Sequence, residues 1–490
     1  MTPKEICKND EGYRKYRHSL LLVFFAALNR VLKDAQISVR QSVNRSTYIE
    51  FPSPVSAKTA AQIKDEMQRL ITADFPLKTT EVTRNAAAQL FKSAHQDEAA
   101  RKIAFTPREN IRLFEDSGRF YSVYGEIFDS AGCLGSFDLI CFESGLLLKY
   151  PHPYYDGFPP FSQGKKIIKT IDDYHAWRKL TGPEDVFALN ELIRNGKIRE
   201  LINISEIMHG KTLASIADTI KSDILDKRII LISGPSSSGK TTFAERLMLH
   251  LRVCGITPLV INLDDYFYDR DKAPRDENGN YDFEGIECLD YERCRADMGT
   301  LINGGEVSVP RYDFEHGKSV PNARKIQLKK SEVLIVEGIH ALSEKLTLGL
   351  PSKALYKVYC SALTTLCFDN FNPISPTDTR LLRRIIRDSQ FRSLSAAETI
   401  KIWDNISRGE VKNVFPYEDD ADTVFNSSLC YEFAVYKKIA LPLIENADRE
   451  LGGDYRCKRL SELLSYFDGL DASFVPPMSV IREFIGNGLV

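Results

Sequence analysis

The pattern of apolar and polar positions differs between the two parts of the chain. After residue 228, short continuous apolar runs are separated by stretches with helical spacing, which is typical of buried parallel strands in an α/β sheet. The expected strands are 229–233, 258–263, 333–336 and 355–360. Before residue 160, amphipathic helices alternate with short strands. The sequence therefore predicts a parallel sheet with helices on both faces, preceded by an α+β domain.

Within the first part, helical spacing predicts two helices and alternation predicts three strands. The helices are expected at 13–32 and 57–72, and the strands at 46–51, 111–115 and 120–127, with a turn at 116–118. Helices are also expected within 166–225 and at 431–446 and 458–467. The predicted division is an α+β domain (1–160), a helical connector (161–225), an α/β domain (226–430) and a helical C-terminal extension (431–490).

The apolar stretch 19–28 follows a basic run and superficially resembles a signal-peptide core. It is too short to span a bilayer, and Asn29 and Arg30 continue it with helical polarity. We expect a buried helix there and no membrane-spanning segment.

Composition excludes several classes of protein. Hydrophobic residues make up 43% of 490, which is normal for a globular chain of two or three domains. The 65 basic residues nearly balance the 67 acidic ones, so the overall charge does not favour nucleic-acid binding, although a local basic patch stays open. The ten cysteines form no CxxC pair, which indicates reduced thiols and a cytoplasmic location.

A phosphate-binding loop gives the strongest chemical signal. The segment 234–241 fits GxxxxGK[ST] between an apolar strand and a helix. In such a loop, backbone N–H groups surround phosphate oxygens, a lysine contacts the β- and γ-phosphates, and a hydroxyl binds Mg²⁺. The predicted ATP-binding residues here are Gly234, Pro235, Ser236, Ser237, Ser238, Gly239, Lys240, Thr241 and Thr242, with Thr241 also predicted to bind Mg²⁺.

Two acidic positions follow other strands of the expected sheet. Glu337 ends the strand at 333–336, where P-loop proteins carry an acid that helps to hold Mg²⁺, although acids are also common at strand ends. Asp265 follows the strand at 258–263 and could orient a hydroxyl acceptor and accept its proton. Aromatic neighbours such as Tyr268 would provide an apolar wall, or could be ordinary core residues beside an acidic loop.

Four arginines lie on one face of a predicted helix: Arg380, Arg383, Arg384 and Arg387. Four cations packed together repel one another unless anions are present, which would suit a lid that closes over ATP. A solvated basic face is the alternative.

Together these blocks carry a resemblance to a known family. GPSSSGKTT, the D-x-F-Y of 265–268, YDFE (281–284), VPRYDF (309–314), VLIVEGIH (333–340) and DTRLLRRIIRD (378–388) resemble, in order and spacing, the uridine kinase/phosphoribulokinase family over residues 226–430. The resemblance implies a P-loop kinase with Asp265 and Lys240 as catalytic residues. It further implies acceptor contacts from Tyr312 and Arg383, nucleotide contacts from Arg387 and Arg392, and Glu337 near Mg²⁺.

The chain also departs from uridine kinases in the acceptor region. Glu284 stands where those enzymes have an aspartate that binds the ribose, Gly317 stands where they have a histidine, and Arg311 is an added charge. Tyr268, Glu284 and Arg311 are still predicted to face the acceptor. A nucleoside is the expected acceptor; a sugar phosphate or another polyol, and a nucleotide-responsive RNA-binding regulator, are the alternatives.

Residues 13–155 resemble the editing domain of threonyl-tRNA synthetases through segments around Arg17-His18-Ser19, Leu90-Phe91-Lys92 and Phe137-Asp138-Leu139. The editing tetrad of that family is incomplete, because His18 and Cys141 remain while Leu22 and Gly145 occupy the other two positions. Editing and a zinc site are therefore not expected. A role in dimerisation, regulation or RNA contact stays open, and a homo-oligomer is expected.

Overall fold

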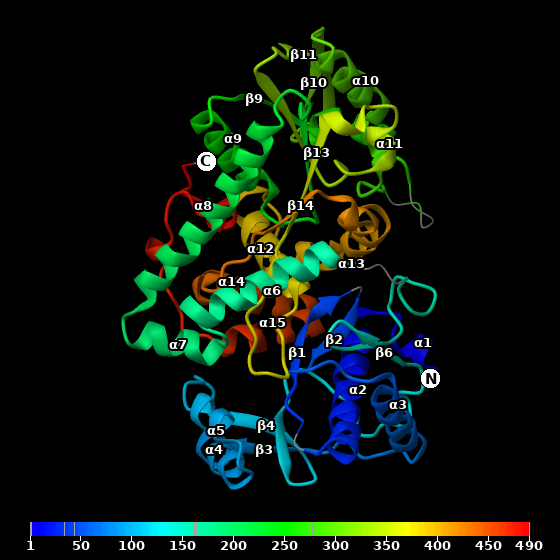
Figure 1. The fold of residues 1–490 in the computed structure, drawn as a ribbon, viewed down its shortest axis with the longest axis vertical. Helices are drawn as coiled ribbons and strands as arrows, with labels where there is room; N and C mark the ends of the chain where they lie inside the picture. The colour runs from blue at the N-terminus through cyan, green and yellow to red at the C-terminus, as the bar shows by residue number, and fades with distance from the viewer. Residues whose placement is uncertain are drawn as a thin grey trace.

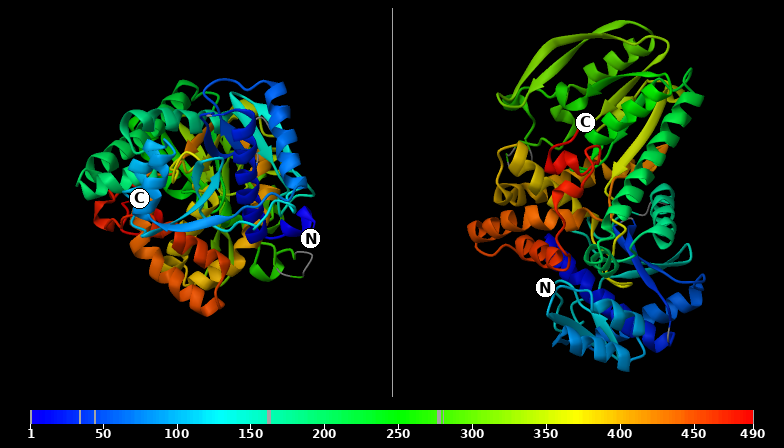
Figure 2. Two further views of the ribbon diagram at one scale, coloured as in Figure 1. Left: turned by 90° about the horizontal axis from the view of Figure 1, so that it is seen from below. Right: turned by 90° about the vertical axis from the view of Figure 1, so that its left-hand side faces the viewer.

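The computed structural model describes residues 2–33, 35–43, 45–160, 164–275, 279 and 281–489. The molecule is elongated, with the N-terminal α+β domain at one end and the α/β domain at the other (Figure 1). The C-terminal helices fill the space between the two domains (Figures 1 and 2). The predicted fold class, a parallel sheet with helices preceded by an α+β region, is confirmed.

The N-terminal domain is built around one long buried helix. Helix α2 (Asp10–Val31) begins after Asn9, whose side chain accepts a hydrogen bond from Gly12 N, and it buries Leu20, Phe24 and their neighbours. The segment that resembles a signal-peptide core lies within α2, so the expected buried helix is confirmed. No helix of the described residues is long and apolar enough to cross a membrane.

Two small antiparallel sheets surround α2. The first has the order β1-β2-β7-β6 and the second the order β3-β4-β5. The strands are β1 (Ser38–Val43), β2 (Ser46–Glu50), β3 (Thr79–Thr83), β4 (Asn110–Asp116), β5 (Arg119–Ser122), β6 (Asp138–Phe142) and β7 (Gly145–Lys149). The helices are α1 (Pro3–Ile6), α3 (Ala57–Thr72), α4 (Arg84–Ser93) and α5 (Asp97–Ile103).

One strand expectation in this domain is wrong in its length. The turn at Ser117 and Gly118 has positive φ at both residues, as a tight hairpin requires, but β5 ends at Ser122 instead of continuing to residue 127. Tyr124 leaves the sheet and stacks on Phe368 of the α/β domain, with ring centroids 4.3 Å apart. A contact between domains therefore ends the strand early.

The described residues of the segment expected to connect the domains form three helices, and the first and third of them pack on the sheet of the α/β domain. The three helices are α6 (Lys165–Thr181), α7 (Val186–Arg194) and α8 (Ile198–Ser222). On α8, Leu213, Ile216 and Ile220 share a core with Ile230 of the central strand. Helix α8 is therefore part of the α/β domain in structural terms. The predicted boundary at 160–161 adjoins residues 161–163, which lie outside the described residues.

The α/β domain contains a five-stranded parallel sheet with the order β14-β13-β8-β12-β9. The strands are β8 (Ile229–Ser233), β9 (Thr257–Asn262), β12 (Glu332–Glu337), β13 (Leu355–Ser361) and β14 (Thr423–Asn426). Four of them match the predicted strands to within about one residue at each end. The β10–β11 hairpin (Glu306–Asp313 and Lys318–Gln327) lies beyond the edge of this sheet (Figure 1).

The remaining helices are α9 (Lys240–Val253), α10 (Tyr291–Ile302), α11 (Glu344–Thr347), α12 (Pro376–Phe391), α13 (Ala396–Asn413), α14 (Glu432–Leu451), α15 (Tyr455–Ser465) and α16 (Arg482–Ile485). The expected helices at 431–446 and 458–467 correspond to α14 and α15. Both share one hydrophobic core with α12 and α13. The C-terminal extension is thus continuous with the α/β domain.

Candidate active site

The loop between β8 and α9 follows a backbone path that favours glycine. Gly234 has φ of +156°, and a Cβ there would lie 1.9 Å from the carbonyl oxygen of Cys360. Gly239, with φ of +87°, directly precedes α9, and a Cβ there would lie 2.6 Å from Val480 Cγ2. Ser237 also has positive φ, 57°, which strains a non-glycine residue by about 1–3 kcal/mol. The expected strand–loop–helix arrangement is present, and its curvature depends on these residues.

Helix α12 lies behind this loop and binds its carbonyl oxygens. Arg383 is 0% exposed and forms an ion pair with Glu432 at 2.8 Å. Its Nη1 lies 3.1 Å from Ser427 Oγ and 3.4 Å from the carbonyl oxygen of Ser238. The guanidinium of Arg383 is thus buried on the carbonyl side of the loop, and its expected contact with an acceptor stays a prediction. With carbonyls held behind, the loop can present its N–H groups forward.

The other arginines of α12 are paired with carboxylates of this chain. Arg384 Nε and Arg387 Nη2 lie 3.1 and 2.8 Å from the carboxylate of Asp388, which is buried. Arg384 also donates to Ser236 Oγ at 2.6 Å, which joins α12 to the phosphate loop. Arg392 lies farther from Asp388, at 3.9 Å, and its side chain is 53% exposed. The expectation that these cations lack anions is wrong; nucleotide contacts from Arg387 and Arg392 stay predictions.

The carboxyl edge of the sheet brings an acid close to the loop lysine. Glu337 ends β12, in register with Ile232 of β8 and Asn262 of β9. Burial raises the pKa of Glu337 to about 7, against the effect of the Lys240 ammonium. Lys240 is buried, and its Nζ donates to the carbonyl oxygen of Pro235 at 3.2 Å. The loop, its lysine and the strand-end acid therefore form one site.

Two adjacent aspartates follow β9 and differ in their surroundings. Asp265 Oδ1 accepts a hydrogen bond from Tyr312 N at 3.2 Å. Burial raises the pKa of Asp265, while this bond and nearby arginines of the hairpin lower it. Burial also raises the pKa of Asp264, but the charges that oppose this rise are Lys240 and Arg392. Asp264 is therefore coupled to the phosphate loop, and Asp265 to the hairpin. Sequence reasoning singled out Asp265 and missed Asp264, because adjacent identical residues give no signal of orientation.

Aromatic residues surround the Asp265 side of this edge. Tyr312 on β10 is buried, with its ring centroid 5.5 Å from that of Phe267 and 5.0 Å from that of Phe314. Tyr268 and Arg311 are exposed nearby in the chain. These rings cluster beside Asp265, and their role as a wall for the acceptor stays a prediction.

Glu284 lies against helix α13. A Cβ on Gly409 would lie 2.3 Å from Glu284 Cβ, and Asn413 Nδ2 donates to the carbonyl oxygen of Glu284 at 2.8 Å. Burial raises the pKa of Glu284 to about 7, while the charge of Arg384 lowers it. Glu284 thus lies between α13 and the arginines of α12, where a contact with the acceptor stays a prediction.

Two further carboxylates contact N–H groups of the phosphate loop region, and sequence reasoning missed both. Thr242 N donates to Glu483 Oε2 at 3.1 Å, in the first turn of α9. Ser236 N donates to Glu410 Oε1 at 2.8 Å. Glu483 belongs to the C-terminal segment, which runs alongside the molecule from α15 up to α9 (Figure 1). These carboxylates satisfy amides that could otherwise bind phosphate oxygens, and no local sequence signal links them to the loop.

The residues present also fit a magnesium ion held together with a nucleotide. Thr241 is exposed at the start of α9, and the charge of Asp264 adds to the rise in the pKa of Glu337, a repulsion that a divalent cation would relieve. Among the described residues, no group of three or more Asp, Glu, His or Cys could hold a metal by itself.

Comparison with known proteins supports this picture for the α/β domain. Residues 229–433 match the profile of the Phosphoribulokinase / Uridine kinase family. The C-terminal part of the chain contains a P-loop kinase domain of this family. A uridine kinase from Halobacterium salinarum is 27% identical over 157 residues, 32% of this chain and 60% of the relative. The inorganic pyrophosphatase TTM2 of Arabidopsis thaliana is 30% identical over 162 residues, 33% of this chain and 20% of that protein.

The chain thus spans less than two thirds of the length of these two relatives. Among solved structures, D-glycerate 3-kinase from Cryptococcus neoformans matches with a TM-score of 0.22 and 14% identity, covering 56% of this chain and 88% of that one. The resemblance of residues 13–155 to an editing domain stays a prediction.

Proposed function

We propose that this protein is an ATP-dependent kinase that transfers the γ-phosphoryl group of ATP to a hydroxyl of a small acceptor, and that the acceptor is a nucleoside. The main support is the meeting of the phosphate loop, Lys240 and an aspartate pair at one edge of a parallel sheet, where ligands bind in such folds. A regulator that only senses nucleotides has no need of an acceptor-side carboxylate.

In this proposal, Lys240 moves from the carbonyl oxygen of Pro235 to the β- and γ-phosphates when ATP binds. Asp265 accepts the proton of the acceptor hydroxyl as the oxygen attacks the γ-phosphorus, and ADP leaves. The Tyr312 N–H bond fixes the Asp265 carboxylate in place. Bound Mg²⁺ would neutralise charge on the phosphates, with Thr241 and Glu337 holding it directly or through water.

Asp264 is a second candidate for the base, because its charge is coupled to Lys240 and Arg392. The two assignments differ in a measurable way. With Asp265 as the base, Asp265→Asn lowers kcat by about 10²–10⁴ while ATP binding is nearly unchanged. Asp264→Asn would then mainly raise the KM for Mg-ATP. The reverse pattern assigns the base to Asp264, and full activity in both variants refutes a carboxylate base here.

The acceptor is identified by an ATP-consumption screen across nucleosides, sugar phosphates and polyols, with Lys240→Ala as the inactive control. Transfer to a nucleoside supports the proposal, whereas transfer only to a sugar phosphate favours the alternative suggested by the exposed Arg311. Phosphate release without any phosphorylated acceptor would mean hydrolysis, and would overturn the kinase assignment. A homo-oligomer, a cytoplasmic location and an RNA contact of the N-terminal domain stay predictions.

A further inference from the structure

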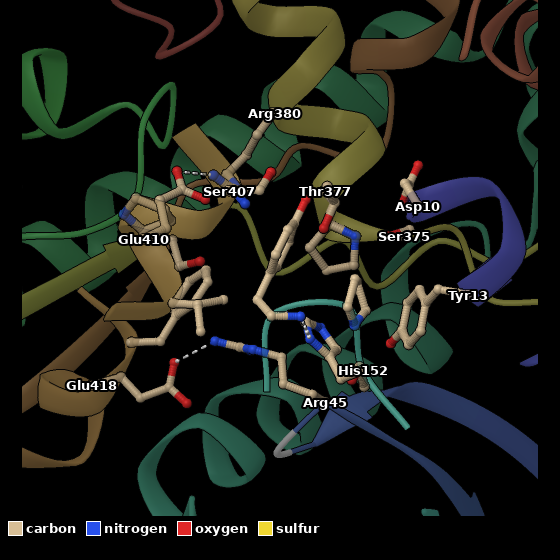
Figure 3. A pocket seen from close by; sticks show the side chains of 18 of the residues that line it. Asp10, Tyr13, Arg45, His152, Ser375, Thr377, Arg380, Ser407, Glu410 and Glu418 are labelled. Carbon is tan, nitrogen blue, oxygen red and sulfur yellow. Dashed lines mark hydrogen bonds and ion pairs between the residues drawn. The ribbon is translucent and has the colours of Figure 1, made fainter. Parts of the chain in front are cut away.

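A large cavity lies between the two domains, and its wall includes Pro235 of the phosphate loop but not Asp265. It occupies about 1240 Å³, counting its open mouth. Figure 3 shows side chains from both domains that point into it: Tyr13, Arg45 and His152 from the N-terminal domain, and Arg380 and Glu410 from α12 and α13. A neighbouring hollow of about 940 Å³ shares wall residues with it, so the two adjoin. Of the catalytic residues proposed above, none lines either hollow.

Arg17 lies at the junction of the two hollows and lines both. Its Nη2 lies 2.9 Å from His18 Nε2, and among the described residues no carboxylate forms an ion pair with it. The neighbouring Arg14 differs, because it pairs with Asp10 at 2.8 Å and with Asp378 at 2.9 Å. Burial and the charge of Arg17 lower the pKa of His18, so the histidine is neutral and leaves Arg17 as the cation of this pair. A half-buried cation without an acid is suited to an anionic ligand.

Two nearly fully buried polar side chains of the walls keep atoms without hydrogen-bond partners. Gln41 is 2% exposed; its Oε1 bonds His175 Nε2, but its Nε2 has no partner among the described residues. Glu410 is 1% exposed; its Oε1 binds Arg380 and Ser236 N, but its Oε2 has no partner among the described residues. Leaving such a group unsatisfied costs about 1–3 kcal/mol. A ligand with an acceptor for Gln41 and a donor for Glu410 would remove this cost.

Aromatic rings form much of the remaining wall. They come from both domains: Tyr13, His152, Tyr154, Trp403 and Phe415. Burial lowers the pKa of His152 to about 3, so this ring is uncharged at neutral pH. Arg45 covers the face of Phe415 at 3.7 Å and lies 3.9 Å from Glu418, a long ion pair that leaves its charge partly uncompensated. Flat apolar walls around an uncompensated cation favour a ligand that combines a ring with a negative charge.

We propose that this inter-domain cavity binds a small organic anion that carries a planar ring and a hydroxyl or amino donor. The anion contacts Arg17, the ring lies among the aromatic side chains, and the donor bonds Glu410 Oε2. This site is separate from the kinase site, and its ligand is an effector and not the acceptor.

The cavity wall is also the support of the phosphate loop. Glu410 accepts from Ser236 N, and Arg380 Nη1 lies 3.3 Å from the carbonyl oxygen of the same residue. Pro235 of the loop lines the cavity directly. A donor that bonds Glu410 Oε2 draws negative charge toward that oxygen and so weakens the hydrogen bonds that Arg380 and Ser236 N donate to Oε1. Occupancy of the cavity therefore changes the position of one loop amide, and with it the affinity for ATP.

The test measures binding to the full-length protein by calorimetry, with and without saturating non-hydrolysable ATP analogue. The probes are L-tryptophan, which has a carboxylate, an amino donor and a ring; adenosine monophosphate, which has a phosphate, hydroxyls and a ring; and inorganic phosphate, which lacks a ring. We expect one ring-bearing probe to bind at least tenfold more tightly than inorganic phosphate, and to change the Kd of the analogue at least threefold.

Arg17→Ala should weaken that probe at least tenfold, whereas Arg17→Lys should retain most of the affinity. Arg69→Ala removes an exposed arginine on α3 and is the matched control. Ser42→Trp fills the cavity from an exposed position of its wall and should abolish binding of the probe. This variant tests the proposal independently if Arg17→Ala does not fold. The proposal is overturned if neither ring-bearing probe binds at millimolar concentration, if each competes directly with the ATP analogue, or if Ser42→Trp leaves binding unchanged. None of these outcomes depends on turnover, so failure of the cavity proposal can be distinguished from failure of the kinase proposal.

Discussion

The contact between Glu483 and the first turn of α9 predicts that the C-terminal segment competes with ATP. Thr242 N donates to Glu483 Oε2 at 3.1 Å, at a helix N-terminus whose dipole favours negative charge. P-loop proteins use amides of this region to bind the α- and β-phosphates. The carboxylate and a phosphate oxygen cannot accept the same N–H bond in full. Removing the carboxylate should therefore strengthen ATP binding.

The magnitude follows from the kind of bond. A hydrogen bond to a charged group contributes about 1.5–3 kcal/mol. Glu483 is half-buried, so solvent screening places the effect near the lower end. Its charge also raises the pKa values of Glu245 and Glu337 nearby, which shows that negative charge is already concentrated there. We expect Glu483→Ala to lower the Kd for Mg-ATP about tenfold, equivalent to about 1.4 kcal/mol.

Calorimetric titration of the full-length variant with Mg-ATP measures this change. Glu483→Gln keeps an acceptor oxygen but loses the charge, so its effect should be smaller, about threefold. Glu450→Ala removes an exposed acid on α14 and serves as the control. An unchanged Kd in Glu483→Ala would refute the competition, and a higher Kd would mean that Glu483 assists nucleotide binding. A parallel melting curve separates either result from loss of the helix cap, which costs about 1 kcal/mol.

Three further predictions concern α12 and its surroundings. Arg383→Leu should lower the free energy of unfolding in urea by about 3–5 kcal/mol, because it leaves Glu432 buried without its partner; a loss below 1 kcal/mol contradicts this role. Arg392→Ala, at an exposed position, should leave unfolding unchanged and raise the KM for ATP several-fold; an unchanged KM removes the lid assignment. Burial raises the pKa of Glu284 to about 7, so the folded protein retains a proton that the unfolded chain releases above pH 4.5, and this group makes stability fall as pH rises from about 4.5 to 7. Glu337 contributes a similar fall, so Glu284→Gln should make the decline shallower; an identical pH profile in both proteins contradicts this.

The sheet and the phosphate loop could be predicted because each depends on short segments of sequence. A buried parallel strand such as β8 is a continuous apolar run, and the loop after it needs glycines at fixed positions. The strand β14 was missed because its four residues carry no distinctive pattern, and it joins the sheet only by pairing with β13. Pairing between distant segments has no local signal.

The roles of the α12 arginines could not be predicted for the same reason. Helical spacing correctly placed Arg380, Arg383 and Arg387 near one another, but spacing does not reveal the carboxylates that come from elsewhere. Glu410 and Glu432 lie 30 and 49 residues from their arginine partners. An argument from repulsion between cations therefore failed, because these tertiary partners had already neutralised the charge.

The start of α12 links the N-terminal domain to the phosphate loop through a short chain of contacts. Asp378, in the first turn of this helix, pairs with Arg14 of the N-terminal domain at 2.9 Å. Two and five residues later, Arg380 and Arg383 bind the carbonyl oxygens of the phosphate loop. A shift of α12 by less than 1 Å would be enough to break hydrogen bonds of about 3 Å on either side. Because the same helix makes both contacts, we expect movement between the domains to change the loop, and ligands of the loop to change the contact between the domains.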